Sequence, residues 1–386
     1  MKFHPLVTVA TTVLLMVASP GLSVGETNAN AASATSKTKL LSQQEAIDAL
    51  IARLMKEHQL KAVLFGLQLG DEPVMMMGWG ESMAGVPAAP DMQVRLGAIS
   101  IAYLGSLLLQ LVDEEVVALD DPVGKWLPEL PKAESVTLRM LINCTSGYPD
   151  YVTYDKFTDA FYADVFRTWT PRELIDLALE QPLVFDPGEN WHYAHTNFVI
   201  LGLALEKATG HPMERMIQER IINRFDLEAT TNPTTPAMAP PILQSYTGER
   251  GVYESATFWN PSWTLARGAV MNGTVADILT SARAIGTGTG LSDSSKAAMF
   301  QPQTAGMAIW NEQRWFGLGV VINQGWVVQN PTFHGYAGVM AYLPEQELSI
   351  AVYSTRLEGG DDDLNASVEI FEALTDRLTP AHSLAK

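Results

Sequence analysis

Segments that favour β-strands lie at the two ends of the chain and segments that favour helices fill the middle, which restricts the fold more than any other feature. Short apolar or alternating runs bounded by turn residues indicate strands, and they occur at 63–69, 74–79, 305–310, 314–323, 338–343 and 348–354. Longer apolar stripes with helix-starting residues indicate helices, and they occur at 42–54, 99–112, 136–142, 171–180, 197–209, 212–224 and 364–378. A sheet made from strands so far apart must be assembled around a helical centre, so the sequence predicts an α/β protein.

The composition limits the classes of protein to which this chain can belong. Its 386 residues can bury a full core in one large or two medium domains. The 25 basic residues against 43 acidic residues give a net charge of −18, which disfavours nucleic acid as the main partner. An apolar content of 47% with only 18% charged residues excludes a disordered chain or a coiled coil. The single cysteine, Cys144, permits no internal disulfide and no thiolate metal cluster.

Residues 1–31 have the layout of a cleavable secretory signal peptide. Lys2 precedes an apolar stretch at 6–17, and a tract of small residues ends at Ala31. The apolar stretch is short for a membrane span, and an N-terminal anchor that stays attached is the alternative. We therefore expect a secreted or periplasmic protein with no stable membrane span after cleavage. The rest of the chain is expected to form a flexible leader at 32–41, one main domain at 42–378 and a tail at 379–386. Within the main domain, we expect a mostly helical insert at about residues 98–300.

Four stretches of the sequence share their order and spacing with one known family. The first stretch is Arg95-Leu96-Gly97, together with residues 119–123 after the following helix, and the second is 145–151. The third is Pro187-Gly188-Glu189, together with Tyr193 and Leu201-Gly202, and the fourth is 335–344. Together they resemble the penicillin-recognising serine hydrolases, which include class C β-lactamases, D-alanyl-D-alanine carboxypeptidases and related esterases. The resemblance extends over about residues 42–378. It implies an antiparallel sheet flanked by N- and C-terminal helices, together with a mostly helical subdomain.

The resemblance also implies a catalytic apparatus from which this sequence departs. In the family, a serine at the start of a buried helix attacks a carbonyl group, and a lysine one helical turn later takes the proton of the serine. Alignment through Arg95-Leu96-Gly97 places Ala98 at the serine position and Ile101 at the lysine position. Alanine cannot form an acyl-enzyme and isoleucine cannot accept a proton. The sequence therefore predicts that the covalent mechanism of the family is lost.

Two further motifs of the family are kept in part. A Tyr-x-Asn segment of the family corresponds to Tyr193-Ala194-His195, where the tyrosine remains and histidine replaces the amide. A Lys-Thr-Gly or His-x-Gly strand corresponds to Phe333-His334-Gly335 in an alignment without gaps, which puts Phe333 at the position of the cation. A shift of one residue with a deletion would put His334 there instead. The resemblance thus assigns Tyr193, His195, Ala98, Ile101 and the segment 333–335 to one degenerate cleft.

These residues leave three hypotheses about function open. The first is a secreted pseudoenzyme that binds a cell-wall peptide or another acyl ligand in the retained cleft, which Ala98 and Ile101 would make apolar. The second is an enzyme that performs non-covalent acid–base chemistry through Tyr193 and His195. The third is a divergent serine hydrolase with another nucleophile, such as Ser100. We expect a small-molecule or peptide ligand and no cofactor or metal, since the helical spacing of His192 and His195 has no evident third ligand.

Overall fold

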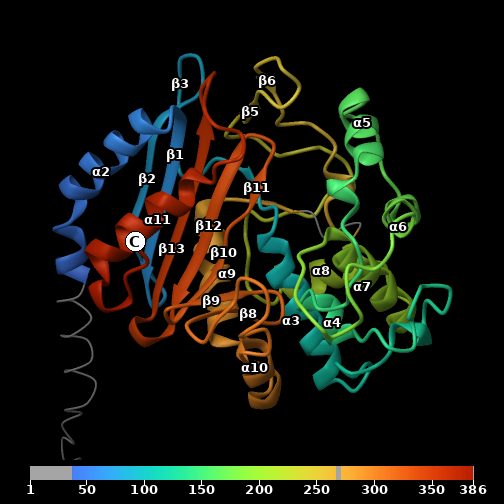
Figure 1. Cartoon of the computed structure of the whole chain (residues 1–386). Helices are drawn as coiled ribbons and strands as arrows, with labels where there is room; N and C mark the ends of the chain where they lie inside the picture. Colours follow the sequence, from blue (N-terminus) through green and yellow to red (C-terminus); the bar gives the residue numbers. More distant parts are fainter. Residues whose placement is uncertain (1–36, 267–270, 386) are drawn as a thin grey trace, which may run out of the picture.

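The computed structural model describes residues 37–266 and 271–385 of the chain. The predicted signal peptide at 1–31 and the first half of the predicted leader, 32–36, lie outside the described residues. In the described part, a large antiparallel sheet stands beside a region of helices (Figure 1). The helices are α2 Gln44–Glu57, α3 Ile99–Asp113, α4 Leu138–Ile142, α5 Asp155–Ala163, α6 Pro171–Leu179, α7 His195–Thr209, α8 Met213–Ile217, α9 Val275–Thr287, α10 Asp293–Phe300 and α11 Ala366–Leu378. None of the helices in these two ranges is both long and apolar enough to cross a membrane.

The sheet joins strands from both ends of the chain. The strands of the protein are β1 Leu60–Leu69, β2 Glu72–Met83, β3 Val86–Pro87, β4 Val94–Arg95, β5 Tyr246–Thr247, β6 Glu254–Ser255, β7 Asn272–Gly273, β8 Arg314–Phe316, β9 Val321–Asn323, β10 Trp326–Gln329, β11 Thr332–Phe333, β12 Tyr336–Leu343 and β13 Leu348–Arg356. In the described residues the main sheet has the order β3-β2-β1-β13-β12-β10-β9-β8, with β11 paired to β12. The first long strand therefore pairs with the last, from Ala62 opposite Thr355 to Leu69 opposite Leu348.

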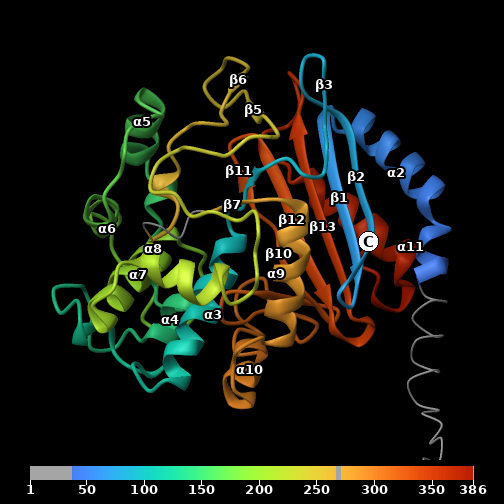
Figure 2. The same ribbon diagram turned by 180° about the vertical axis from the view of Figure 1, so that it is seen from behind.

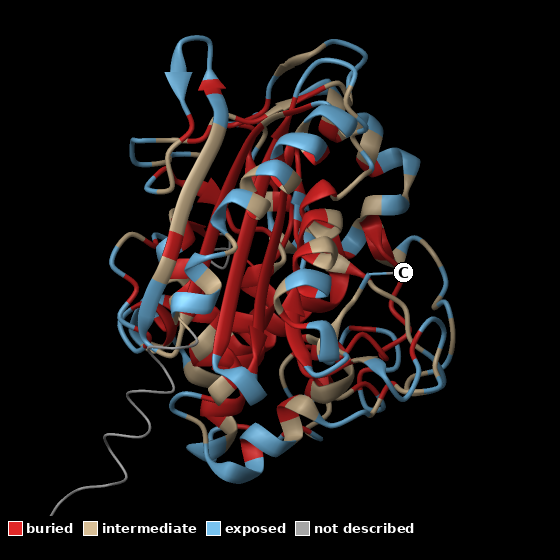
Figure 3. Cartoon of the chain, turned by 90° about the vertical axis from the view of Figure 1, so that its left-hand side faces the viewer, coloured by how far each residue is buried: buried red, intermediate tan, exposed pale blue. Residues whose placement is uncertain are grey.

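Helices cover both faces of this sheet. On one face α2 and α11 pack through apolar side chains such as Ile51 and Phe371 (Figure 1). On the other face α9 lies against the central strands (Figure 2). Figure 3 shows the central strands buried while the helices in front of them expose their outer sides. The central strands β12 and β13 are buried along their whole length and mostly apolar, because neither face meets water.

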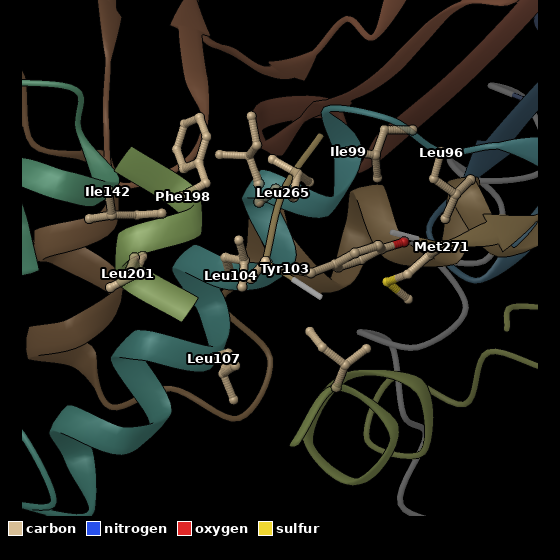
Figure 4. Close-up of a cluster of buried hydrophobic side chains, with 14 of the residues drawn as sticks. Leu96, Ile99, Tyr103, Leu104, Leu107, Ile142, Phe198, Leu201, Leu265 and Met271 are labelled. Atoms are coloured by element: carbon tan, nitrogen blue, oxygen red, sulfur yellow. The ribbon is translucent and has the colours of Figure 1, made fainter. Parts of the chain in front are cut away.

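Helix α3 forms the centre of the helical region. Its sequence is apolar on all sides, which is typical of a helix that is buried all round, and residues 99–111 are all buried. Figure 4 shows part of this core, with Leu104 and Leu107 on α3 and Phe198 and Leu201 on α7. The helix therefore lies in the core of the protein, and its first residues lie near the sheet.

The predicted fold class is confirmed, since the chain is an α/β protein with a large antiparallel sheet and flanking helices. One predicted strand, 305–310, is wrong because left-handed backbone at Gly306 (φ +86°) and Ala308 (φ +47°) produces turns there. The predicted strand at 314–323 is divided in two, because Gly319 (φ +83°) lies in a turn between β8 and β9.

The start of the described chain also differs from the prediction. Residues 37–41, which were expected to end a flexible leader, are helical. The following helix α2 begins after Gln43, not after the expected cap Ser42. The hydroxyl group of Ser42 instead donates a hydrogen bond to the carbonyl oxygen of Lys39 at 2.7 Å. The serine thus closes the turn that precedes α2.

The end of the chain is packed where the sequence predicted a tail at 379–386. The indole nitrogen of Trp326, which is fully buried, donates to the carbonyl oxygen of His382 at 3.0 Å. The backbone nitrogen of Leu384 donates to the hydroxyl oxygen of Thr375 at 2.9 Å. These bonds attach residues 379–385 to the sheet and to α11.

Candidate functional site

A cavity of about 360 Å³ lies where the start of α3, the segment before α7 and the strands β8, β10 and β11 meet. Its walls contain six aromatic side chains, a histidine, an arginine and several small polar side chains. The lining residues are Gly97, Ala98, Trp191, Tyr193, His195, Trp263, Thr264, Leu265, Ile309, Trp310, Arg314, Phe316, Val321, Gln329, Asn330, Thr332 and Phe333. A cavity of this size with mostly apolar walls and a few polar groups is typical of a small-molecule site.

The start of α3 contributes Ala98 to the cavity. Ala98 is the N-cap of α3 and lines the cavity, whereas Ile101 is 1% exposed and belongs to the core. The side chain of Ile101 therefore does not line the space that a ligand can reach. Ser100, the alternative nucleophile, is fully buried and does not line the cavity. A nucleophile has to contact its substrate, so this geometry does not favour Ser100.

Two of the predicted residues, Tyr193 and His195, lie side by side in the wall of the cavity. Their ring centroids are 5.1 Å apart with an angle of 88° between the ring planes. Tyr193 belongs to the extended segment before α7, and His195 is the first residue of that helix. Burial, with smaller contributions from Cys144 and Asp150, raises the pKa of Tyr193 well above its ordinary value. Its phenol therefore stays protonated at neutral pH, where its hydroxyl group can donate a hydrogen bond to a ligand.

A buried carboxylate orients the ring of His195. The Oδ2 atom of Asp150 lies 3.0 Å from Nδ1 of His195, and Oδ1 accepts from the backbone nitrogen of the same residue at 3.2 Å. Oδ1 also accepts from the backbone nitrogen of Val152 at 3.1 Å. Since Asp150 is 6% exposed, it needs these donors. The carboxylate favours the tautomer with hydrogen on Nδ1, which leaves Nε2 of a neutral His195 as an acceptor.

Asp150 is a residue of the site that the sequence did not identify. It lies within the motif at 145–151, but nothing in that motif indicates a pairing with a histidine 45 positions later. The only available signal was its place in that motif, directly before Tyr151. Tyr151 is buried and its ring centroid lies 6.1 Å from that of His195.

The segment 333–335 divides between the cavity and the protein interior. Phe333 lines the cavity, and its ring is stacked with that of Trp263 at 5.9 Å and 6°. His334 does not line the cavity: its Nδ1 lies 2.9 Å from Oε2 of Glu249, and its ring is stacked on Phe161 at 5.0 Å. The side chain that the gap-free alignment puts at the cation position thus reaches the cavity, and His334 does not.

Gly335 has a role in the backbone and not in the lining of the cavity. Its φ of +81° lies in the left-handed region, and an added Cβ atom would lie 2.2 Å from the carbonyl oxygen of Tyr246. Only glycine fits this close approach. Gly335 therefore allows β5 to pass close to the start of β12.

Metal ligation has no support in the described part of the chain. In residues 37–266 and 271–385, no group of three or more His, Cys, Asp or Glu side chains is placed to hold a metal ion. The single thiol, Cys144, is fully buried, and burial raises its pKa to about 12.

Comparison with known proteins gives consistent matches. A family model described as Beta-lactamase matches residues 47–375. Penicillin-binding protein 4* of Bacillus subtilis (strain 168) is 27% identical over 169 residues, which cover 42% of this chain and 36% of that protein. Penicillin-binding protein 4 of Amycolatopsis lactamdurans is 26% identical over 289 residues, 68% of this chain and 70% of that protein. The crystal structure of a D-stereospecific amidohydrolase from Streptomyces sp. has a TM-score of 0.74 and 27% identity, over 86% of this chain and 97% of that chain. The Bacillus protein is thus matched over little more than a third of its own length.

Proposed function

Because the chain belongs to the β-lactamase family of serine hydrolases, we propose that it is a secreted pseudoenzyme that binds a cell-wall peptide or another acyl ligand in the cleft of that family. The observation that carries the proposal is Ala98, which is the N-cap of α3 and lines the cavity. This is the position that the sequence alignment assigns to the nucleophilic serine. We also keep as proposals the signal peptide at 1–31 and the domain boundaries at 42 and 378, with a helical insert at about 98–300.

The surroundings of Ala98 support binding without covalent chemistry. A methyl group replaces the hydroxyl group that would attack a substrate, and Ile101 in the core replaces the base. Aromatic side chains such as Trp263 and Phe333 provide apolar contact area beside it. A ligand with an aromatic or aliphatic acyl group would gain free energy by removing its own apolar surface and these rings from water.

The test measures acylation directly. The mature protein is incubated with a fluorescent penicillin and with p-nitrophenyl butyrate, and its intact mass is then measured. We expect no adduct. An adduct that disappears in Ser100→Ala would instead establish a serine hydrolase with a different nucleophile, and an adduct on any other serine would equally refute the pseudoenzyme.

The double variant Ala98→Ser with Ile101→Lys shows whether the rest of the cleft remains competent. We expect it to remain unacylated, because position 101 lies in the core and its new amine would not face the cavity. Acylation of this variant, and not of the single variant Ile101→Lys, would show that the cleft had lost only these two groups.

The pairing of Asp150 with His195 favours a second candidate function, non-covalent acid–base catalysis. A histidine held by a buried carboxylate can take a proton from a water molecule that attacks a bound ester or amide. The neighbouring Tyr193, kept neutral by burial, can donate a proton to the leaving group. Unlike the family mechanism, this reaction needs neither a serine nor a lysine.

The second candidate is tested by steady-state hydrolysis of ethyl butyrate, followed by acid release, because its ethoxide leaving group needs a proton whereas p-nitrophenolate would leave without one. If it is correct, wild type will exceed the uncatalysed rate, and His195→Gln and Tyr193→Phe will each lower kcat. The neighbouring His192→Gln, which changes a histidine outside the cavity lining, will keep the wild-type rate. Equal rates in wild type and Tyr193→Phe would remove the tyrosine from the mechanism. Equal rates in wild type and His195→Gln would refute the candidate.

A further inference from the structure

The charges around the cavity differ from those of the protein as a whole. The chain has 43 acidic residues and a net charge of −18. Among the described residues that line the cavity, none carries a carboxylate, and Arg314 is the one permanently charged side chain. The carboxylate of Asp150 lies behind His195 and is not part of the lining, so the surface of the cavity is suited to a negatively charged group.

Arg314 is placed to interact with such a group. It is the first residue of β8, and its guanidinium carbon lies 5.3 Å from the ring centroid of Trp310, which also lines the cavity. Other surface arginines, such as Arg53 and Arg172, form salt bridges with carboxylates. In the described part of the chain, the side chain of Arg314 forms only this contact with a ring and no salt bridge. Its cation is therefore available to a ligand.

Two groups of aromatic rings surround the remaining space. In one group, the ring centroid of Trp191 lies 4.9 Å from that of Trp310 and 5.8 Å from that of Phe316. The other group is the stacked pair of Trp263 and Phe333. All five side chains line the cavity. Rings arranged in this way favour a flat or aliphatic apolar group, and the position of Arg314 beside Trp310 fixes where the charge of the ligand would lie.

We propose that the ligand of this cavity is an amphipathic anion, in which an aromatic or acyl group lies among the rings and a carboxylate pairs with Arg314. This inference rests on the proposed function, because it requires that the cavity binds a ligand. It adds that the ligand carries a negative charge and names the residue that recognises that charge. Arg314 acts here as a specificity determinant, since binding of the apolar part does not depend on it.

The experiment compares two probes that differ only in charge. Naphthylacetate and its uncharged amide, naphthylacetamide, are titrated separately into the protein at about pH 8 by isothermal titration calorimetry. We expect wild type to bind the carboxylate about twofold to fivefold more tightly than the amide, which is the upper part of the range for an exposed ion pair. In Arg314→Gln the two probes should bind equally, while the affinity for the amide stays at the wild-type value and shows that the cavity is intact.

Two further variants separate local from general charge effects. Arg53→Gln changes the net charge by the same amount on α2, where Arg53 pairs with Glu57, and it should keep the wild-type preference for the carboxylate. Arg314→Lys keeps the charge and should keep part of that preference; a complete loss in this variant would contradict a role for the charge.

The remaining outcomes distinguish the inference from the proposed function. Equal binding of both probes by wild type, or an unchanged preference in Arg314→Gln, would overturn the assignment of Arg314 and leave a cavity that binds apolar ligands. Absence of binding by either probe up to its solubility limit would contradict both the inference and the proposed function.

Discussion

Replacing Ile101 by lysine tests whether the position of the missing base is now part of the core. Ile101 is 1% exposed, and full burial of an isoleucine contributes about 1.5–3 kcal/mol. A lysine in such an environment has to lose its proton, because burial lowers its pKa from about 10.4 to roughly 6. In the unfolded chain the lysine keeps its pKa of about 10.4, and removing its proton costs about 1.36 kcal/mol for each unit by which the pH lies below that pKa. At about pH 7 the deprotonation therefore costs about 4–5 kcal/mol.

The expected pH dependence has a definite sign. Between about pH 7 and pH 9 the unfolded variant binds about one proton more than the folded variant, so its stability relative to wild type rises with pH. Two pH units correspond to about 2.7 kcal/mol. Urea unfolding of wild type, Ile101→Lys and the control Ile101→Met, followed by tryptophan fluorescence at several pH values, measures the effect. The methionine variant should lose less than about 1.5 kcal/mol at every pH.

The reasoning would fail if Ile101→Lys lost no more stability than Ile101→Met. It would also fail if the difference from wild type did not change with pH. Either result would mean that an ammonium group at position 101 stays solvated and reaches the cavity. The floor of the cleft would then still accept a base, and the double variant Ala98→Ser with Ile101→Lys would no longer be expected to remain unacylated.

Three other substitutions or treatments test parts of the structure independently. Asp150 accepts hydrogen bonds from the backbone nitrogen and from Nδ1 of His195, and Asp150→Asn leaves only one oxygen atom to accept them. The substitution should lower the free energy of unfolding by about 1–3 kcal/mol; an unchanged urea midpoint would contradict the pairing. Gly335→Ala should lower the free energy of unfolding by about 4 kcal/mol, because the new Cβ atom overlaps a neighbouring carbonyl group. Gly306 has a similar φ but open space around it, so Gly306→Ala should lower the free energy of unfolding by only about 1–2 kcal/mol. The thiol of Cys144, whose pKa is raised by burial to about 12, should resist iodoacetamide at about pH 8 until urea is added, as measured by intact mass; equal alkylation of native and unfolded protein would show that the thiol is accessible.

The location of the cavity could be predicted from the sequence because the motifs carry positional information. Ala98, Tyr193, His195 and Phe333 line the cavity, whereas Ile101, His334 and Gly335, which the motifs place in the same cleft, do not. The motifs do not show, however, which way the side chain of a neighbouring residue such as His334 points. The motif at 333–335 predicts a strand, but His334 lies in the turn between β11 and β12 with a left-handed φ of +37°, so the motif does not reveal that its ring pairs with Glu249.

Other parts of the site depend on contacts between segments that are distant in the sequence. Arg314 and Trp310 reach the cavity through β8 and the turns before it. The sequence assigned that region to strands, because the left-handed backbone at Ala308 has no glycine to signal it. Likewise, the pairing of Asp150 with His195 requires that the loop before α5 meets the start of α7. Such contacts are determined by packing and not by local preference.

The pairing of β1 with β13 has a consequence for how the protein is made. During synthesis, β1 and β2 leave the ribosome nearly the whole length of the chain before Leu348–Arg356, the strand that completes the hydrogen bonds of β1. Until then a nascent chain has an apolar strand with an open edge, which is a template for association with other chains. The sheet can therefore close only after translation has nearly ended, and β1 lacks its partner strand β13 for most of that time.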